Sequence, residues 1–147
     1  MLGLSDWFKA NKLSLNVKKS NYVIFKPKQR SEEFDLNIEI NGYKMIRTKE
    51  FTFLGVILDE NLSWKSNISH IACTISKSVG LIGRPSPCLA TFALKTLYYS
   101  LVYPYFQYCI IVWGSTYPTN LNRLILLQKR IIRIVNKKPF DAHTDPL

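Results

Sequence analysis

The sequence predicts an α+β protein in which a small antiparallel sheet is followed by an α-helical bundle. Short runs rich in β-branched and aromatic residues, separated by turn residues, fill the first 60 positions. Longer stretches with apolar residues at helical spacing fill the rest of the chain. With 147 residues, of which 47% are hydrophobic, the chain is long enough and apolar enough to bury a core.

The first 60 residues predict one helix followed by strands. Ser5 is a candidate N-cap for a helix over residues 6–12, because its hydroxyl can accept a hydrogen bond from a first-turn amide. Asn41-Gly42 predicts a two-residue hairpin, because a type I′ turn needs positive φ at both central residues. Gly55 interrupts the last strand, where we expect a bulge or a close backbone approach. The expected strands are residues 21–25, 36–40, 43–46 and 51–58.

The second half predicts helices. Ser63 is a candidate cap for a helix over 64–79, in which apolar residues recur three, four or seven positions apart. A helix over 92–103 is apolar nearly all round, so we expect it to be buried. Pro104 kinks or restarts it, and a last amphipathic helix ends near Asn136.

The positive charge is concentrated in the helical half. The net charge is +10, yet residues 61–140 contain no Asp or Glu and carry ten Lys and Arg residues. Ordinary surfaces mix both signs, so a segment of one sign indicates a polyanionic partner, the alternative being a solvated basic surface. On the last helix Arg123, Arg130 and Lys137 lie seven residues apart, with Arg133 beside them, and this stripe fits phosphate contacts.

Residues for catalysis or metal binding are not clustered in the sequence. No two aspartates are adjacent, whereas two-metal phosphoryl chemistry needs grouped carboxylates. His70 lies within an expected helix and His143 in the tail, and neither has a catalytic context. The three cysteines are widely spaced, which excludes a Cys-x-x-Cys zinc site. We therefore predict no catalytic residue, metal ligand or cofactor for this chain.

Short motifs occur in a recognisable order along nearly the whole chain. They are Trp7, Asn11-Lys12-Leu13, Leu15-Asn16, Lys19-Ser20, Val23-Ile24-Phe25, residues 51–56, Asp59, Leu62, Trp64, Leu97-Tyr98, Ser100-Leu101-Val102, Pro104, Tyr108-Cys109, Trp113-Gly114, Gln128-Lys129-Arg130, Arg133-Ile134 and residues 143–147. This ordered series resembles the end of the palm and the thumb of reverse transcriptases (RNA-directed DNA polymerases) from jockey-like non-long-terminal-repeat retrotransposons.

The resemblance implies three segments and a nucleic-acid ligand. Residues 1–60 would be the end of the palm with a primer-grip-like hairpin, 61–138 a helical thumb and 139–147 a truncated tail. Their partner would be an RNA or RNA–DNA hybrid template–primer. Lys19 matches a lysine thought to neutralise or protonate the leaving pyrophosphate. The nucleic-acid-binding residues implied are Lys19, Phe53, Leu54, Gly55, Lys65, Arg123, Lys129, Arg130, Arg133 and Lys137.

The chain also departs from that family. The catalytic aromatic-Ala-Asp-Asp turn, the fingers and most of the palm are missing from the sequence. We therefore expect a fragment that does not polymerise alone and that would work with those missing segments. Mg²⁺ is expected only for the complete polymerase. An intracellular location is expected, in the nucleus or in a cytoplasmic ribonucleoprotein.

Two alternatives remain open at the level of sequence. Residues 96–114 carry no charge and are long enough to span a membrane once. Pro104, Gln107 and the tyrosines in the middle of this run argue against a span. The second alternative is a nonfunctional element remnant whose strands leave unpaired edges, so that it does not fold stably.

Overall fold

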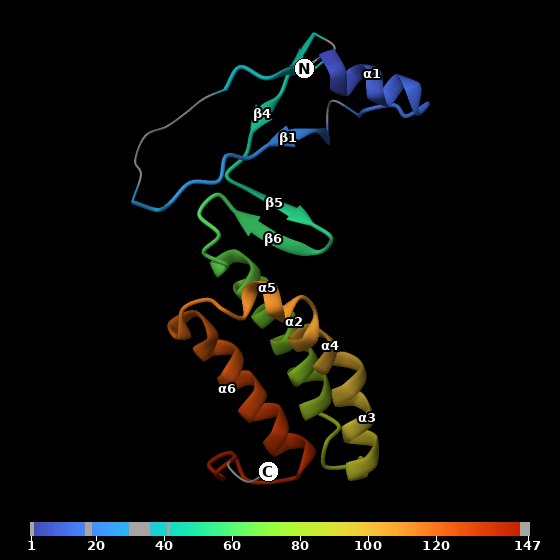
Figure 1. The fold of residues 1–147 in the computed structure, drawn as a ribbon. Helices are drawn as coiled ribbons and strands as arrows, with labels where there is room; N and C mark the ends of the chain where they lie inside the picture. Colours follow the sequence, from blue (N-terminus) through green and yellow to red (C-terminus); the bar gives the residue numbers. More distant parts are fainter. Residues whose placement is uncertain (1, 17–18, 30–35, 41, 145–147) are drawn as a thin grey trace. The chain divides into compact units, whose positions relative to one another are not determined.

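The computed structural model describes residues 2–16, 19–29, 36–40 and 42–144. The chain divides into two compact units, Met1–Ser63 and Trp64–Leu147, which we describe separately as the strand unit and the helical unit. All described strands lie in the strand unit, and the longest helices lie in the helical unit (Figure 1). The predicted α+β class is therefore confirmed. Asn41 and residues 145–147, for which the sequence also made predictions, lie outside the described residues.

The strand unit contains one helix and three two-stranded ladders among its described residues. The elements are α1 Leu2–Ala10, β1 Asn21–Tyr22, β2 Glu39–Ile40, β3 Tyr43–Lys44, β4 Ile46–Arg47, β5 Glu50–Phe53 and β6 Val56–Asp59. Strands β2–β3 and β5–β6 pair antiparallel as predicted, whereas β1 pairs with β4 in parallel. Most strands are shorter than the sequence pattern predicted.

Local turn chemistry explains where these elements begin and end. Ile40 pairs with Tyr43, so the predicted two-residue hairpin is confirmed, and Gly42 has the expected positive φ of 77°. The single strand predicted over 51–58 is wrong, because Leu54 and Gly55 form a two-residue turn between β5 and β6. The N-cap prediction for Ser5 is also wrong, since α1 already begins at Leu2.

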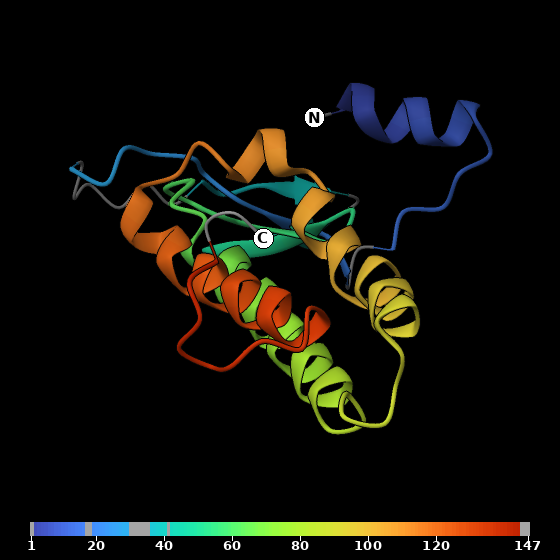
Figure 2. The same ribbon diagram turned by 90° about the horizontal axis from the view of Figure 1, so that it is seen from below.

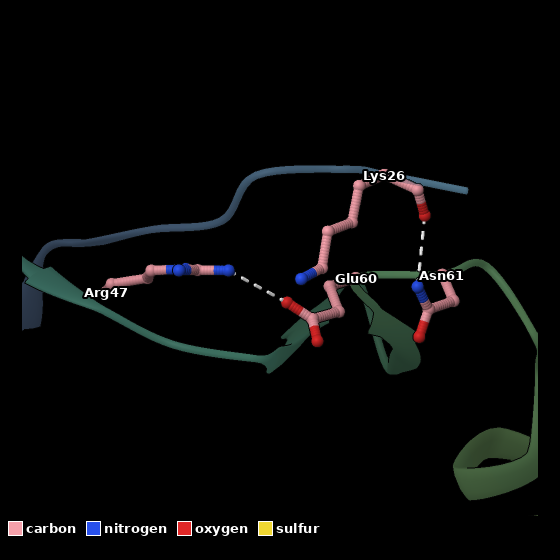
Figure 3. Close-up of polar contacts among 4 residues, drawn as sticks. All are labelled: Lys26, Arg47, Glu60 and Asn61. Atoms are coloured by element: carbon pink, nitrogen blue, oxygen red, sulfur yellow. Dashed lines mark hydrogen bonds and ion pairs between the residues drawn. The ribbon is translucent and has the colours of Figure 1, made fainter. Parts of the chain in front are cut away.

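Polar contacts link separate segments of the strand unit (Figure 3). The Arg47 guanidinium lies 3.1 Å from the Glu60 carboxylate, and both side chains are largely shielded from solvent. The side-chain amide of Asn61 donates a 3.0 Å hydrogen bond to the backbone carbonyl of Lys26. The backbone amide of Lys26 in turn donates to the backbone carbonyl of Glu60. These contacts hold the chain around residue 26 against the end of β6, in a unit whose described core is small.

The helical unit is built on two long helices. Helix α2 (Lys65–Gly83) packs against α6 (Pro118–Val135) and against α3 (Thr91–Leu101), as Figures 1 and 2 show. Two short helices, α4 (Tyr103–Gln107) and α5 (Ile110–Trp113), connect α3 to α6. The largest fully buried side chains of this core are Ile75, Val79, Ile82, Leu94, Val102 and Ile131.

Tertiary packing moves both ends of α2 away from the predicted positions. The N-cap position falls on Trp64, which has a φ of 64°, one residue after the predicted Ser63, and the Ser63 amide donates to the Asp59 carboxylate. The helix continues past the predicted end at Val79 to Gly83. Ile82 is fully buried on the same face as Ile75, and this burial outweighs the low helix propensity of the glycines.

The segment after α2 is more exposed and more broken than predicted. Leu94 is the one described residue of α3 that is buried, and Phe92 is 82% exposed, so the prediction of a buried helix is wrong. The apolar run 96–114 is divided among α3, α4 and α5, with breaks at Val102 and at Cys109, whose φ is 53°. Pro104 lies in the first turn of α4, so the helix restarts there as predicted. Among the residues that the structure describes, no helix is both long and apolar enough to cross a membrane.

Trp113 and Gly114 together close the end of α5. Trp113 is buried, and its indole N–H donates a 2.8 Å hydrogen bond to the Tyr108 carbonyl. A Cβ on Gly114 would lie 2.5 Å from the Ile110 carbonyl oxygen, so only glycine fits. The Trp-Gly pair therefore has a packing explanation that does not require a ligand.

Replacing Ile75 by Ala should lower the free energy of unfolding by about 2–5 kcal/mol, because it leaves a cavity between α2 and its neighbours. The matched control is Ile111→Ala, since Ile111 is 93% exposed and its truncation should change stability by less than about 0.5 kcal/mol. Urea unfolding followed by circular dichroism at the helical band measures both. Equal losses in the two variants would contradict this core.

Alkaline pH should destabilise the helical unit through Tyr98. Burial, followed by repulsion from the negative charges that Tyr99 and Tyr103 acquire on ionisation, raises the pKa of Tyr98 above its ordinary value of 10.0. Because this pKa is higher in the folded chain, the stabilising contribution is complete below about pH 10 and disappears as pH rises through the folded-state value. Above pH 10 the Tm should fall more steeply for the natural chain than for Tyr98→Phe. If the Tm of the two proteins fell equally with pH, Tyr98 would not be the cause of the alkaline destabilisation.

Candidate nucleic-acid interface

Helix α6 buries apolar residues on one side and exposes cations on another, together with the apolar side chains of Ile125 and Leu126. Leu124, Ile131 and Val135 are buried, as the periodicity predicted, whereas Arg123 and Arg130 are exposed. This helix therefore packs on the core through one side and presents cations on another.

The predicted stripe of cations does not continue past the end of α6. The Lys138 amide donates to the Arg133 carbonyl and the Lys137 amide to the Ile134 carbonyl, the two hydrogen bonds of a Schellman C-cap. Lys137 occupies the left-handed position of this motif, with a φ of 53°. The prediction that Lys137 stacks above Arg123 and Arg130 on one helical face is therefore wrong.

Helices α2 and α6 run in the same direction, so their C-terminal ends lie together (Figure 1). A pocket of about 440 Å³ opens between these ends, and we call it the basic pocket. The helices approach closely there, since a Cβ on Gly83 would lie 3.4 Å from the Ile134 side chain. Its lining residues are Val79, Gly80, Gly83, Arg84, Arg130, Arg133, Ile134, Lys138 and Phe140.

Arg133 fixes the segment that follows α6 against one side of the pocket. Its Nε donates a 2.7 Å hydrogen bond to the Ala142 carbonyl, and its guanidinium carbon lies 5.9 Å from the centroid of the Phe140 ring. Phe140 is nevertheless 79% exposed. A large aromatic ring is thus held in place at the rim of a basic pocket while remaining open to solvent.

The basic pocket has cations but no acidic side chain in its lining. Within the described part of the chain, the side chains of Arg84, Arg130 and Lys138 form no hydrogen bond or ion pair. The nearest acid along the sequence, Asp141, is not among the lining residues. Four cationic side chains around one opening produce a positive potential that attracts anions.

The other sequence-predicted cations of the helical unit do not line this pocket. Lys65 is exposed in the first turn of α2, at the opposite end of that helix. Arg123 is exposed in the first half of α6, and Lys129 is half-buried near its middle. The structure thus brings Arg130 and Arg133 together at the pocket, whereas the other four, Lys137 included, do not line it.

In the strand unit, Lys19 lines a pocket of about 470 Å³ together with Glu50, Phe51 and Thr52 of β5. Phe53, Leu54 and Gly55 do not line it, because they form the tip of the β5–β6 hairpin. The tip is exposed and apolar, with Leu54 74% exposed. Leu54 and Gly55 both have positive φ, 47° and 81°, as a type I′ turn requires.

The sequence did not single out Arg84, Lys138 or Phe140 as a site. The two cations were visible as part of the acid-free segment, but Phe140 carried no signal. Their meeting depends on the parallel packing of α2 and α6, which helical periodicity does not specify. Among the described residues, no group of three or more His, Cys, Asp or Glu side chains lies together to hold a metal ion.

The chain is similar in sequence to polymerases of mobile elements. It is 29% identical over 111 residues to the RNA-directed DNA polymerase from mobile element jockey of Drosophila funebris, a match that covers 73% of this chain. It is 23% identical over 135 residues to the probable RNA-directed DNA polymerase from transposon X-element of Drosophila melanogaster, and 26% identical over 141 residues to that from transposon BS of the same fly. These matches cover 89% and 93% of the chain.

These similarities confirm the resemblance to reverse transcriptases of jockey-like non-long-terminal-repeat retrotransposons. The chain spans only 12–15% of the length of these relatives. No protein-family model matches the chain. No solved structure matches it significantly.

Substitutions at the two turn positions of the β5–β6 hairpin, Leu54 and Gly55, should change its stability in opposite directions. Leu54→Asn should stabilise the hairpin by about 1 kcal/mol, because Asn tolerates the left-handed region better than Leu. Gly55→Ala should destabilise it by about 1–2 kcal/mol, since a Cβ is strained at this φ. Amide hydrogen exchange at the paired residues Thr52 and Ile57 measures both changes. Shifts of the same sign would contradict the turn assignment.

Proposed function

We propose that this chain holds template–primer nucleic acid as a thumb-like and primer-grip-like part of a retrotransposon reverse transcriptase. The observation that carries the proposal is the sign of the charge on the helical unit. Its segment 64–140 has ten Lys and Arg residues and no acid, and this segment folds around a common core. A folded surface of one sign is suited to a polyanion, and the relatives are RNA-directed DNA polymerases by name.

The contact would be made to phosphates rather than to base edges. Lys65 on α2 and Arg123 and Arg130 on α6 are exposed, and such long cationic side chains can reach the phosphate groups of a nucleic-acid backbone. Phosphate contacts fix the position of a duplex without reading its sequence. A polymerase thumb needs this property, because it must follow any template.

The strand unit would contribute the primer-grip-like contact. The exposed tip at Phe53, Leu54 and Gly55 offers apolar side chains and a backbone without a Cβ, which allows nucleic acid to approach closely. Lys19 would neutralise a phosphate group, although Glu50 in the same pocket lowers the local positive potential. We therefore assign Lys19 a weaker share of binding than the cations of α6.

Polymerisation itself is proposed for the longer relatives and not for the residues described here. Those proteins would supply the fingers, the remaining palm and the carboxylates for Mg²⁺. The role of this chain would be to bind and orient the template–primer. Primer extension by the purified chain alone, lost on mutating Lys19, would overturn this division of labour.

A salt titration tests the proposed function. The logarithm of the affinity for an RNA–DNA hybrid should fall linearly with the logarithm of salt concentration, because bound cations displace counterions from the phosphates. Arg123→Gln should reduce this slope by about 0.9, the value for one phosphate contact on a duplex. Fluorescence anisotropy of a labelled hybrid measures it.

The control for this titration is Lys28→Gln, which removes an exposed cation of the strand unit and lowers the net charge by one, as Arg123→Gln does. Its slope should match that of the natural chain. Affinity that does not change with salt, or absence of binding at low salt, would contradict the proposed function. Equal slope changes for Arg123 and Lys28 would show that only net charge matters.

A further inference from the structure

We propose that the basic pocket binds the phosphate group of an unpaired nucleotide and that Phe140 stacks on the adjacent base. This inference rests on the proposed function and adds to it a defined site with a preference for single-stranded nucleic acid. The pocket's volume of about 440 Å³ lies within the range of small-ligand sites. Its lining provides cations for a phosphate and an aromatic ring for a base.

The electrostatics favour an anion despite the helix dipoles. The C-terminal ends of α2 and α6 meet here, and each carries a partial charge of about −0.5 from its helix dipole. Four cationic side chains exceed that total, so the pocket remains positive. Part of their role is to stabilise the helix ends, and a test must separate that structural effect from ligand binding.

The aromatic ring favours an unpaired base over a duplex. Arg133 holds the ring from one side, and the exposed fraction of Phe140 leaves the rest of it open. Bases in a duplex are stacked on each other, whereas a single strand can place a base against an aromatic side chain. The arrangement therefore suits the single-stranded template or displaced strand beside a duplex.

Gly80 provides a way to block the pocket without disturbing the core. It lines the pocket from α2, and a Cβ built there meets no atom within 4 Å. Gly80→Glu would place a carboxylate at the wall of the pocket. Gly80→Gln adds a side chain of the same size without charge, and both replacements raise helix propensity. The Tm of the two variants shows whether the carboxylate also changes stability at this end of α2.

The test uses the full 147-residue chain and a labelled 12-nucleotide oligouridylate, measured by fluorescence anisotropy. Gly80→Glu should bind about tenfold more weakly than Gly80→Gln, the loss expected for one charge-assisted contact. Arg130→Gln should reduce the salt slope by about 0.7, the value for one phosphate of a single strand. Lys77→Gln, which changes an exposed cation of α2 outside the pocket, should leave that slope unchanged.

A second oligonucleotide tests the stacking contact. Phe140→Ala should weaken binding of oligouridylate about tenfold. It should not weaken binding of the matching strand whose bases are removed, which keeps the phosphates but offers nothing to stack. Equal losses on both strands would overturn the role of Phe140. A Tm measurement accompanies each variant, because a purely structural role for the cations would lower the Tm without changing the salt slope.

The outcomes separate this inference from the proposed function. Suppose the natural chain binds the hybrid with the expected salt dependence, but Gly80→Glu matches Gly80→Gln on oligouridylate. Then the basic pocket is not a nucleotide site, and the proposed function stands. Suppose instead the natural chain binds neither the hybrid nor the single strand. Then both proposals fail.

Discussion

The packing of α2 against α6 is the contact on which the rest of the helical unit depends. Each helix buries branched apolar side chains against the other, with Ile75 and Ile131 fully enclosed. Because the two helices run in the same direction, this packing also brings their C-terminal ends together (Figure 1). The same apolar contact that stabilises the unit therefore places Arg84 beside Arg130 and creates the basic pocket.

The helical unit carries only one sign of charge over most of its length. The apolar faces of the helices account for the core, and the acid-free segment leaves cations without neighbouring carboxylates. Repulsion among like charges disfavours the compact state, so an anionic ligand would relieve a cost that the fold otherwise bears. The strand unit has both signs of charge, and its Arg47–Glu60 ion pair links β4 to the residue that follows β6 (Figure 3).

Periodicity predicted the α+β class and the positions of the long helices, because buried residues such as Ile75 and Val79 recur on one face. It failed where the backbone leaves regular geometry. Leu54 in the β5–β6 turn and Lys137 after α6 both adopt the left-handed conformation, which their residue types disfavour. The sequence pattern therefore did not predict that β5 ends before Leu54 or that α6 ends before Lys137. The basic pocket could not be predicted from the sequence for another reason. Arg84 and Phe140 are distant in sequence, and only the packing of whole helices brings them together.

Ultraviolet crosslinking of the full chain to a primed RNA template, followed by peptide mapping, tests the central claim most directly. The claim is that the helical unit binds the nucleic acid, with the basic pocket on the unpaired strand. We predict crosslinks to Phe140 and to the neighbouring part of α6, which disappear when the template overhang is removed. Crosslinks confined to residues 1–63, or the same crosslinks without an overhang, would contradict it.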